Sequence, residues 1–499
     1  MSQISVQNLS FGYEGSLKNV FENVSFVLDT DWKLGLIGRN GKGKTTFLKL
    51  LKGEYEYEGT ITKNVDIDYF PFEIKQKQEM TLDIVLSIVP DVEEWEIIKE
   101  LNLLNTTADI LYRPFSSLSG GEQVKIELAT LFLKKNNFLL IDEPTNHLDI
   151  QARESIVNYM KNKKGFIVVS HERSFLDKVC DHIISINNSN IDIQKGNYSS
   201  WKENMDRQNS YERVQNEKIT KDITRLEVAQ KNTANWSDAV EKTKVGVRIA
   251  GLRPDTGYIG HQAAKMMKRS KVIESRIEKE IDEKKSLLKN VDRQDSLTMK
   301  PLVNKRNPII ILDNVSVIYN QKQVFEPVSF EIRNNDRIAL IGKNGAGKSS
   351  IVKLILNDEK MDYNGNIRKP EQLKISYVSQ NTDFLKGTLK NYAKEENIDE
   401  SIFKAMLAKM GLDIIDLNKN IEDMSEGQKK KVLLAKSISE SADVYLWDEP
   451  LNYIDIITRE QIEEAILKYM PTLVFVEHDD TFVKKIATKK VEVIRKDEK

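Results

Sequence analysis

The sequence contains the pattern Gly-x-x-x-x-Gly-Lys-Thr/Ser twice, once from Gly38 to Thr45 and once from Gly342 to Ser349. Each copy follows a short apolar run typical of a buried strand and precedes apolar residues at helical spacing. The glycines let backbone N–H groups approach phosphate oxygens, and the start of the helix adds partial positive charge. The pattern therefore predicts two phosphate-binding loops. The residues assigned to them are Gly38, Asn40, Gly41, Gly43, Lys44, Thr45 and Thr46, and Gly342, Asn344, Gly345, Gly347, Lys348, Ser349 and Ser350.

The segments around the two loops repeat the same order of strands and helices. In the first copy we expect strands near residues 4–9, 24–28, 138–141 and 166–169, with a helical region at 92–104. In the second copy the corresponding strands are expected near 309–312, 328–332, 444–447 and 473–476. Strands that alternate with helices indicate a mostly parallel sheet covered on both faces. The sequence thus predicts two α/β domains, residues 1–197 and 304–499.

The region between the repeats, residues 198–303, has a different character. Charged residues dominate it, and glycines and a proline cluster between 246 and 260, as in a turn. Apolar residues recur at helical spacing in two runs, Ile219, Ile223 and Leu226, and then Ile273, Ile277, Ile281 and Leu288. These stripes favour a long helical hairpin over the alternative of a flexible charged linker.

Composition excludes several classes of protein. With 40% hydrophobic and 30% charged residues, the chain is expected to be soluble and globular. No run of about 18 apolar residues occurs, so no transmembrane helix is expected, and the N-terminus lacks the segments of a signal peptide. The single cysteine, Cys180, permits no internal disulfide and fits a cytoplasmic location. Because the net charge is −1, affinity for nucleic acid must come from a local patch.

Further motifs follow each phosphate loop in the same order. The first copy has Leu118-Ser119-Gly120-Gly121-Glu122-Gln123, then residues 141–149, and then Ser170-His171. The second has Met424-Ser425-Glu426-Gly427-Gln428, then residues 447–455, and then Glu477-His478. Asp142 lies 23 positions after Ser119, and Asp448 lies 23 positions after Ser425. This repetition indicates two copies of one domain.

The ordered set of motifs, present twice, resembles the ABC-F family, whose members carry two ATP-binding cassettes of the P-loop NTPase fold in one chain and no membrane domain. The resemblance covers essentially the whole chain. Within the family, the sequence is most similar to the Lsa type of antibiotic-resistance factor, through residues 31–41, 113–118, 267–271 and 447–453. The resemblance implies an ATPase with ATP and Mg²⁺ as ligands.

The resemblance and the position of each motif together assign the residues of the two sites. Lys44 and Lys348 are expected to reach the β- and γ-phosphates. Mg²⁺ is expected on Thr45 and Asp142 in one cassette, and on Ser349, Gln380 and Asp448 in the other. Glu143 and Glu449 are placed to orient or deprotonate the attacking water, and His171 and His478 match switch histidines at the γ-phosphate. Tyr13 and Tyr319 match the aromatic residue that stacks on adenine, with an ordinary strand tyrosine as the alternative.

In the family the cassettes pair head to tail, so that each ATP lies between one phosphate loop and the signature segment of the other cassette. Ser119, Gly120, Gly121 and Gln123 are therefore expected to complete the site of Lys348. Ser425, Gly427 and Gln428 are expected to complete the site of Lys44. The implied unit is a monomer whose cassettes dimerise within the chain.

The expected turn of the hairpin is basic. Residues 241–271 hold eight Lys and Arg against two acids. The eight are Lys242, Lys244, Arg248, Arg253, Lys265, Lys268, Arg269 and Lys271. Such a cluster indicates an RNA partner, with a merely solvated face as the alternative. The resemblance implies the 70S ribosome as partner, through 23S rRNA and P-site tRNA. It also implies protection from lincosamides, pleuromutilins and streptogramin A compounds, by a hairpin that enters the E site and points toward the peptidyl-transferase centre.

Two residues depart from the family pattern. Phe72 stands where the family has a glutamine, whereas the second cassette keeps Gln380. Glu426 replaces the first glycine of the signature segment, whereas Gly120 is present in the other copy. Both departures fall on the site of Lys44, and a carboxylate near the triphosphate is unfavourable unless a cation compensates it. The sequence therefore predicts two unequal ATP sites.

Three other functions stay open on the sequence alone. A housekeeping translation factor that rescues stalled ribosomes has the same overall design, although neither cassette has room for the inserted arm that some such factors carry. The ATPase subunit of a drug exporter is disfavoured by the basic hairpin and by the lack of a spanning segment. A DNA-repair ATPase is disfavoured because both cassettes are contiguous.

Overall fold

The computed structural model describes residues 2–14, 19–146, 148, 150–187, 190–242, 256–286, 296–319, 322–356 and 361–496. The chain forms two compact units, Lys202–Arg293 and a larger one that combines Met1–Trp201 with Gln294–Lys499. Among the described residues, no helix has both the length and the apolar character needed to cross a bilayer.

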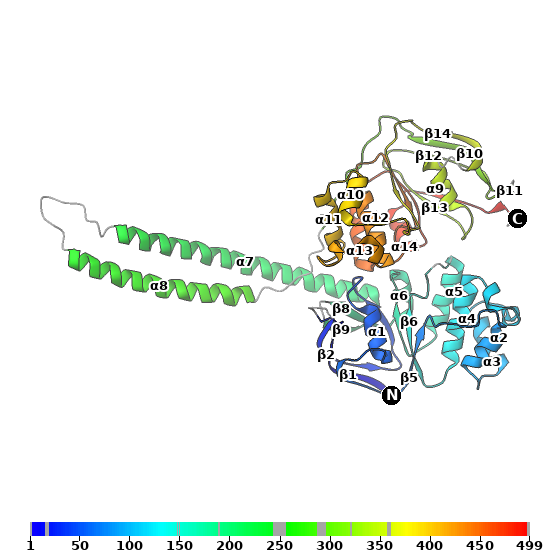
Figure 1. Ribbon diagram of the computed structural model, residues 1–499, viewed down its shortest axis with the longest axis horizontal. Coiled ribbons are helices and arrows are strands. Elements are labelled where there is room, and N and C mark those ends of the chain that lie inside the picture. Colours follow the sequence, from blue (N-terminus) through cyan, green and yellow to red (C-terminus); the bar gives the residue numbers. More distant parts are fainter. Residues whose placement is uncertain are drawn as a thin grey trace. The chain divides into compact units, whose positions relative to one another are not determined.

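The first cassette contains two sheets (Figure 1). Its elements in chain order are β1 (Gln3–Phe11), β2 (Phe21–Asp29), β3 (Lys33–Ile37), α1 (Lys44–Lys52), β4 (Glu58–Lys63), β5 (Asp66–Phe70), α2 (Thr81–Ile88), α3 (Glu94–Leu103), η1 (Ala108–Tyr112), η2 (Phe115–Ser117), α4 (Gly120–Leu133), β6 (Asn137–Asp142), α5 (Ile150–Lys161), β7 (Phe166–Val169), α6 (Arg173–Val179), β8 (His182–Asn187) and β9 (Asn190–Lys195). The larger sheet has the order β5-β6-β7-β3-β8-β9 and is parallel except for the last pair, and β2-β1-β4 form an antiparallel sheet.

The second cassette repeats this design. Its elements are β10 (Ile310–Tyr319), β11 (Lys322–Gln323), β12 (Val328–Ile332), β13 (Arg337–Ile341), α9 (Lys348–Leu356), β14 (Asp362–Arg368), β15 (Ile375–Val378), α10 (Leu389–Glu395), α11 (Glu400–Lys409), η3 (Asp416–Asn418), η4 (Ile421–Asp423), α12 (Glu426–Ser439), β16 (Val444–Asp448), α13 (Ile456–Tyr469), β17 (Leu473–Val476), α14 (Asp480–Ile486) and β18 (Lys489–Glu492). The parallel sheet has the order β15-β16-β17-β13-β18, and β10, β11, β12 and β14 form an antiparallel sheet.

The helix after each phosphate loop is held by the apolar core. In α1, Phe47, Leu48, Leu50 and Leu51 are buried in one cluster with residues of both sheets. The corresponding residues of α9 are buried in the same way in the second cassette. Burial of each such side chain contributes about 1.5–3 kcal/mol. The apolar face of each helix therefore fixes the start of the helix, where the phosphate loop ends.

The smaller unit consists of most of α7 (Tyr198–Lys242) and of α8 (Thr256–Ser286), which run side by side as a hairpin (Figure 1). Ile223 and Ile281 are buried, and Lys284 forms an ion pair with Asp222 at 3.0 Å. The expected helical hairpin is thus confirmed for its described residues, although Ile273 is exposed rather than part of the apolar stripe. The turn and Leu288 lie outside the described residues.

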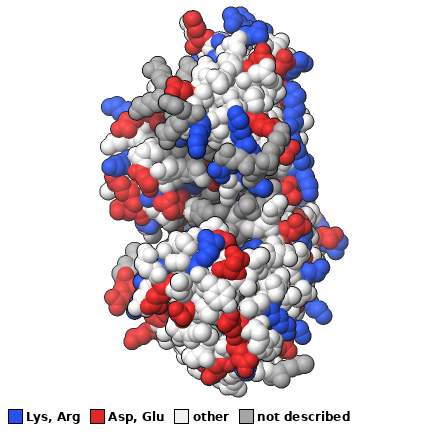
Figure 2. Space-filling view, turned by 90° about the vertical axis from the view of Figure 1, so that its right-hand side faces the viewer, with Lys and Arg blue, Asp and Glu red and all other residues white. Residues whose placement is uncertain are grey.

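Charged side chains of both signs are interspersed on the face of the molecule seen in Figure 2. This mixture agrees with the net charge of −1.

Candidate active sites at the two phosphate loops

Both phosphate loops connect a parallel strand to a helix, β3 to α1 and β13 to α9. The last glycine of each loop, Gly43 or Gly347, has a φ of 96°. A Cβ atom there would lie 2.5 Å from Val20 Cγ1 or from Phe325 Cδ1, so both the conformation and the space require glycine. Lys44 and Lys348 each donate a hydrogen bond of 2.7 Å to the carbonyl oxygen of the first glycine of the loop. Burial lowers the pKa of Lys44.

The second cassette surrounds Glu449 with polar partners. Ser349 Oγ donates to Asp448 Oδ1 at 3.1 Å at the end of β16. Glu449 Oε2 accepts from Gln380 Nε2 at 2.9 Å and from Asn452 Nδ2 at 2.7 Å, and His478 Nε2 lies 3.6 Å from Glu449 Oε1. Burial opposes ionisation of Glu449, but the neighbouring His478 and the hydrogen bonds from Gln380 and Asn452 outweigh it and lower the pKa of this carboxyl.

A cavity of about 480 Å³ opens beside these residues. It is lined by Arg153 of the first cassette and by residues of the second, which include Tyr319, Asn344, Gly345, Gly347, Lys348, Ser349, Ser350, Gln380, Glu449, Asn452 and His478. The structure therefore brings most of the second cassette's own candidate ATP residues to one cavity, but Ser119, Gly120, Gly121 and Gln123, which were expected to complete this site, are not among its lining residues. Tyr319 is 46% exposed in its wall, as an adenine platform requires.

The first cassette arranges the equivalent groups differently. Tyr69 Oη donates to Asp142 Oδ2 at 2.7 Å, and burial raises the pKa of Asp142 despite hydrogen bonds from Tyr69 and Thr45. His171 Nε2 lies 3.2 Å from Glu143 Oε1, at an orientation that does not make a hydrogen bond. Burial, followed by the charge of Asp142, raises the pKa of Glu143 to about 8. Burial and the neighbouring cation Lys44 hold the pKa of His171 well below its usual value.

The strand registers fix the correspondence between Phe72 and Gln380. Phe70 pairs with Ile141, and Val378 pairs with Trp447. Counted two residues on from these pairs, Phe72 is the counterpart of Gln380, as Glu143 is the counterpart of Glu449. Phe72 therefore occupies the position of Gln380, and its side chain has no group that can donate to a carboxylate.

The backbone at both glutamates is unusual. Glu143 has a φ of 51° and Glu449 a φ of 46°. Residues other than glycine and asparagine adopt this left-handed backbone conformation only at a cost in free energy. Such strain clusters at functional sites. Matching strain at equivalent positions supports a shared role for the two carboxylates.

The signature segments begin helices α4 and α12. Ser119 and Ser425 cap these helices, and their partners in the capping box are Glu122 and Gln428. Glu122, not Gln123, is thus the counterpart of Gln428. The sequence interpretation missed Glu122, although counting from the serine would have found it. Gln123 donates instead to the carbonyl oxygens of Phe115 and Leu118 in its own cassette.

The carboxylate of Glu426 has compensating partners. Thr382 Oγ1 donates to Glu426 Oε2 at 2.6 Å, and Lys429 Nζ lies 3.1 Å from Glu426 Oε1. The hydrogen bond from Thr382 is the main cause of the lowered pKa of this carboxyl, ahead of Lys429. The compensating cation that the sequence interpretation called for is therefore present, and Glu426 is a weaker reason for unequal sites than Phe72.

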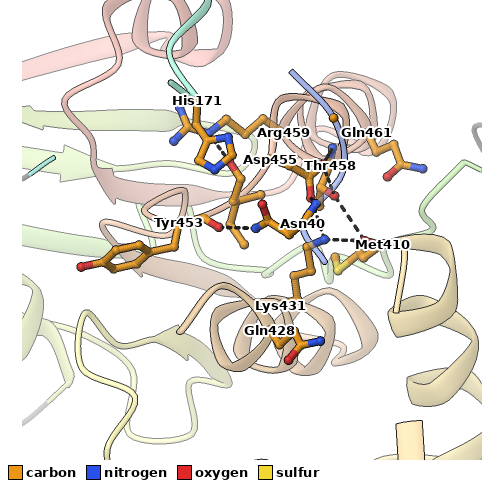
Figure 3. A network of polar contacts seen from close by, with 12 residues as sticks. Asn40, His171, Met410, Gln428, Lys431, Tyr453, Asp455, Thr458, Arg459 and Gln461 are labelled. Atoms are coloured by element: carbon orange, nitrogen blue, oxygen red, sulfur yellow. Dashed lines mark hydrogen bonds and ion pairs between the residues drawn. The ribbon is translucent and has the colours of Figure 1, made fainter. Parts of the chain in front are cut away.

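Residues of the second cassette contact the first phosphate loop directly (Figure 3). Asn40 Nδ2 donates to the carbonyl oxygen of Tyr453 at 2.6 Å, and its backbone N–H donates to Asp455 Oδ2 at 3.3 Å. Asp455 is held by Lys431 of α12 in a fully buried ion pair of 2.7 Å. The segment after Glu449 is thereby linked to the signature helix, a link that the sequence interpretation did not anticipate.

Replacement of Gly427 by alanine is expected to lower ATP turnover about tenfold. A Cβ atom there would lie 2.7 Å from both Asn40 Nδ2 and the carbonyl oxygen of Tyr453, so the contact between the cassettes must open. At the equivalent Gly121 the nearest atom is 3.6 Å away, so Gly121→Ala in the other signature segment is the comparison variant and is expected to lower turnover less than Gly427→Ala does. Steady-state ATPase assays of both variants, with melting temperatures, test this; equal losses would contradict it.

The structure also gives the positions of Tyr13 and of some of the basic residues predicted to bind RNA. Tyr13 is 47% exposed, and its hydroxyl lies 2.7 Å from Thr46 Oγ1. Lys265, Lys268, Arg269 and Lys271 are exposed on α8. The side chain of Lys242 and the residues Lys244, Arg248 and Arg253 lie outside the described residues.

Comparison with known proteins gives matches along the whole chain. The family model described as "ABC transporter" matches residues 21–146 and 325–452. The chain is 27% identical to the ribosome protection protein VmlR of Bacillus subtilis, over 98% of this chain and 86% of VmlR. It is 28% identical to the erythromycin resistance ATP-binding protein MsrA of Staphylococcus epidermidis, over 92% of each chain.

Among solved structures, the fold is similar to that of the archaeal ribosome recycling factor aABCE1, solved in complex with the ribosomal stalk protein aP1. The TM-score is 0.61 at 19% identity, over 97% of this chain and 87% of the other. At this level of identity, the likeness concerns the fold with its two cassettes.

Proposed function

Because this chain belongs to the ABC transporter family, as a twin-cassette ATPase of the ABC-F type, we propose that it is an ATP-dependent ribosome-protection factor. The observation that carries the proposal is the similarity to VmlR over 98% of this chain, which includes the hairpin as well as both cassettes. The similarity to MsrA, whose name refers to erythromycin resistance, supports it.

The residues of the two sites fit Mg²⁺ together with ATP. Ser349 Oγ and Asp448 Oδ1 lie side by side in the second cassette, and Thr45 hydrogen-bonds to Asp142 in the first. Hydroxyl and carboxylate oxygens are the ligands that Mg²⁺ prefers, and the bound ion supplies charge neutralisation at the phosphates. In this proposal, Glu143 and Glu449 orient or deprotonate the attacking water, and His171 and His478 contact the γ-phosphate.

The partner in this proposal is the 70S ribosome. Residues 1–197 and 304–499 act as the cassettes, and the interdomain residues 198–303 act in the ribosomal E site. The protein acts as a monomer in the cytoplasm. The exposed cations Lys265, Lys268, Arg269 and Lys271 are assigned to 23S rRNA phosphates, whose contacts with lysine and arginine dominate such binding. The turn is assigned to the neighbourhood of P-site tRNA and of drugs at the peptidyl-transferase centre, namely lincosamides, pleuromutilins and streptogramin A compounds.

Replacement of Lys265, Lys268 and Arg269 by alanine is expected to weaken ribosome binding. Each lost phosphate contact should lower the slope of log affinity against log salt by about 1. Sedimentation of the full chain with 70S ribosomes over a range of salt concentrations measures this slope. A control that replaces the exposed acids Glu278, Glu280 and Asp282 of the same helix by alanine should leave the slope unchanged or strengthen binding.

Deletion of residues 249–253 tests whether drug protection can be lost while ribosome binding is kept. We expect the deletion to abolish drug resistance in an inhibitory-concentration assay while ATP turnover and ribosome binding stay nearly intact. Resistance that survives the deletion would contradict the assigned role of the turn. If ribosome binding is normal but no drug class is affected even in the wild type, the housekeeping translation factor replaces the present proposal. Sedimentation of an ATP-trapped form with membranes rather than ribosomes would favour the exporter ATPase.

A further inference from the structure

Arg153 lies at the boundary between the two cassettes. It is on α5, four residues after Asp149, and Arg459 has the same place on α13 after Asp455. Each arginine donates through Nε, at 2.9 Å, to a carbonyl oxygen at equivalent positions, Leu148 and Ile454. The structure thus holds the two arginines in the same way, directly after the segments that follow the catalytic glutamates.

The guanidinium group of Arg153 contacts the switch segments of both cassettes through one nitrogen atom. Arg153 Nη1 forms an ion pair of 2.8 Å with Glu172 Oε1, and Glu172 directly follows the switch histidine His171 of the first cassette. The same Nη1 donates to the carbonyl oxygen of His478, the switch histidine of the second cassette, at 3.2 Å. Arg153 also lines the cavity that contains Lys348, Glu449 and His478.

The opposite arginine extends this arrangement. Arg459 Nη1 lies 3.3 Å from Asp479 Oδ2, and Asp479 directly follows His478. Both ion pairs are largely shielded from water, with side chains between 3% and 14% exposed. At such burial an ion pair acts on its neighbours with little screening. Figure 3 shows Arg459 of the second cassette beside His171 of the first. Together with the contact between Arg153 and His478, this places an arginine of each cassette next to the switch histidine of the other.

We propose that Arg153 is a positioning residue that couples the two ATP sites, because its guanidinium group holds the segment of His171 through Glu172 and the segment of His478 through its carbonyl oxygen. Movement of either switch histidine changes a contact of the same side chain, so the state of one site reaches the other directly. This role is separate from any action on the ribosome and is tested with the ATPase alone.

The test measures each site separately in the full-length protein. Glu143→Gln leaves hydrolysis at the site of Lys348, and Glu449→Gln leaves hydrolysis at the site of Lys44. Arg153→Gln, added to each of these backgrounds, is expected to slow single-turnover hydrolysis about tenfold in both, because small displacements of positioned groups cost large factors in rate. Binding of a fluorescent ATP analogue is expected to change by less than about threefold, since Arg153 is assigned to rate and not to affinity.

Two further variants distinguish coupling from a merely structural role. Glu172→Gln is expected to slow both sites as well, and the double variant Arg153→Gln with Glu172→Gln is expected to be no slower than either single variant, because the two residues act as one unit. The matched control is Arg173→Gln. Arg173 has a similar exposure of 12% and pairs with Glu460 and Glu463 of the second cassette. Its loss is expected to change both single-turnover rates by less than about twofold.

A loss confined to one background, or equal losses from Arg153→Gln and Arg173→Gln, would overturn the proposal. Melting temperatures identify variants that fail to fold. In that case Arg153→Lys, which keeps the charge but not the planar fork, carries the test with an intermediate loss expected in both backgrounds. If neither arginine variant folds, absence of an effect of Glu172→Gln on one or both sites overturns the proposal.

Discussion

Replacement of both Glu143 and Glu449 by glutamine is expected to lower ATP turnover by about 10²–10⁴-fold, the usual contribution of a positioned general base. Each glutamate directly follows the aspartate at the end of a buried strand, and each is held with a φ near 50°. Glutamine keeps the size and hydrogen bonding of glutamate but cannot take a proton. ATP should therefore still bind, and the cassettes should remain closed around it.

The double variant should accumulate on ribosomes in the presence of ATP. Sedimentation with 70S ribosomes and steady-state ATPase assays measure the two parts of this expectation. Glu331→Gln is a suitable control, because the side chain of Glu331 is 42% exposed and forms a surface ion pair of 3.0 Å with Arg333. A double variant that keeps wild-type turnover would remove the catalytic assignment, and one that loses turnover without gaining ribosome occupancy would count against the proposed function.

The sequence predicted the parallel sheets and the hairpin because both have strong apolar patterns. The strands expected at 166–169 and 473–476 coincide with β7 and β17, whose residues are all buried. The antiparallel sheets were harder to predict, since β4 and β14 consist almost entirely of exposed residues and have no apolar pattern. Their places are set by pairing with β1 and β10 rather than by their own composition.

The site was predicted as far as its motifs allowed. The second phosphate loop, Glu449 and His478 meet at one cavity because these motif residues follow buried strands of one sheet. Lys431 and Arg153 were not predicted, since a buried charged residue has no distinctive pattern and its partner lies far away in the chain. Arg153 contacts His478 of the other cassette, whereas Lys431 pairs with Asp455 of its own cassette, and Asp455 accepts a hydrogen bond from the backbone N–H of Asn40 in the first cassette.

Glu449→Gln is expected to lower ATP turnover about tenfold more than Glu143→Gln does, because, of the two glutamates, only Glu449 accepts hydrogen bonds from side-chain amides among the described residues. Gln380 and Asn452 donate to Glu449 Oε2 at 2.9 and 2.7 Å. The counterpart of Gln380 in the first cassette is Phe72, whose ring cannot donate. In addition, Tyr69 donates to Asp142 Oδ2, which occupies an oxygen expected to face Mg²⁺. The site of Lys44 is therefore expected to hydrolyse slowly and to retain nucleotide.

Exchanging the side chains at Phe72 and Gln380 tests whether these two residues cause the difference in hydrolysis rate between the two ATP sites. In the Glu449→Gln background, Phe72→Gln is expected to raise the remaining single-turnover rate several-fold, by about the factor that one hydrogen bond to a charged group contributes. In the Glu143→Gln background, Gln380→Phe is expected to lower the rate by a similar factor. The carboxylate of Glu426 is already compensated by Thr382 and Lys429, so Glu426→Gly should change the rate much less than Phe72→Gln does. Equal residual rates in the two glutamate variants would exclude unequal sites, and a dominant effect of Glu426→Gly would move the cause from the strand end to the signature segment.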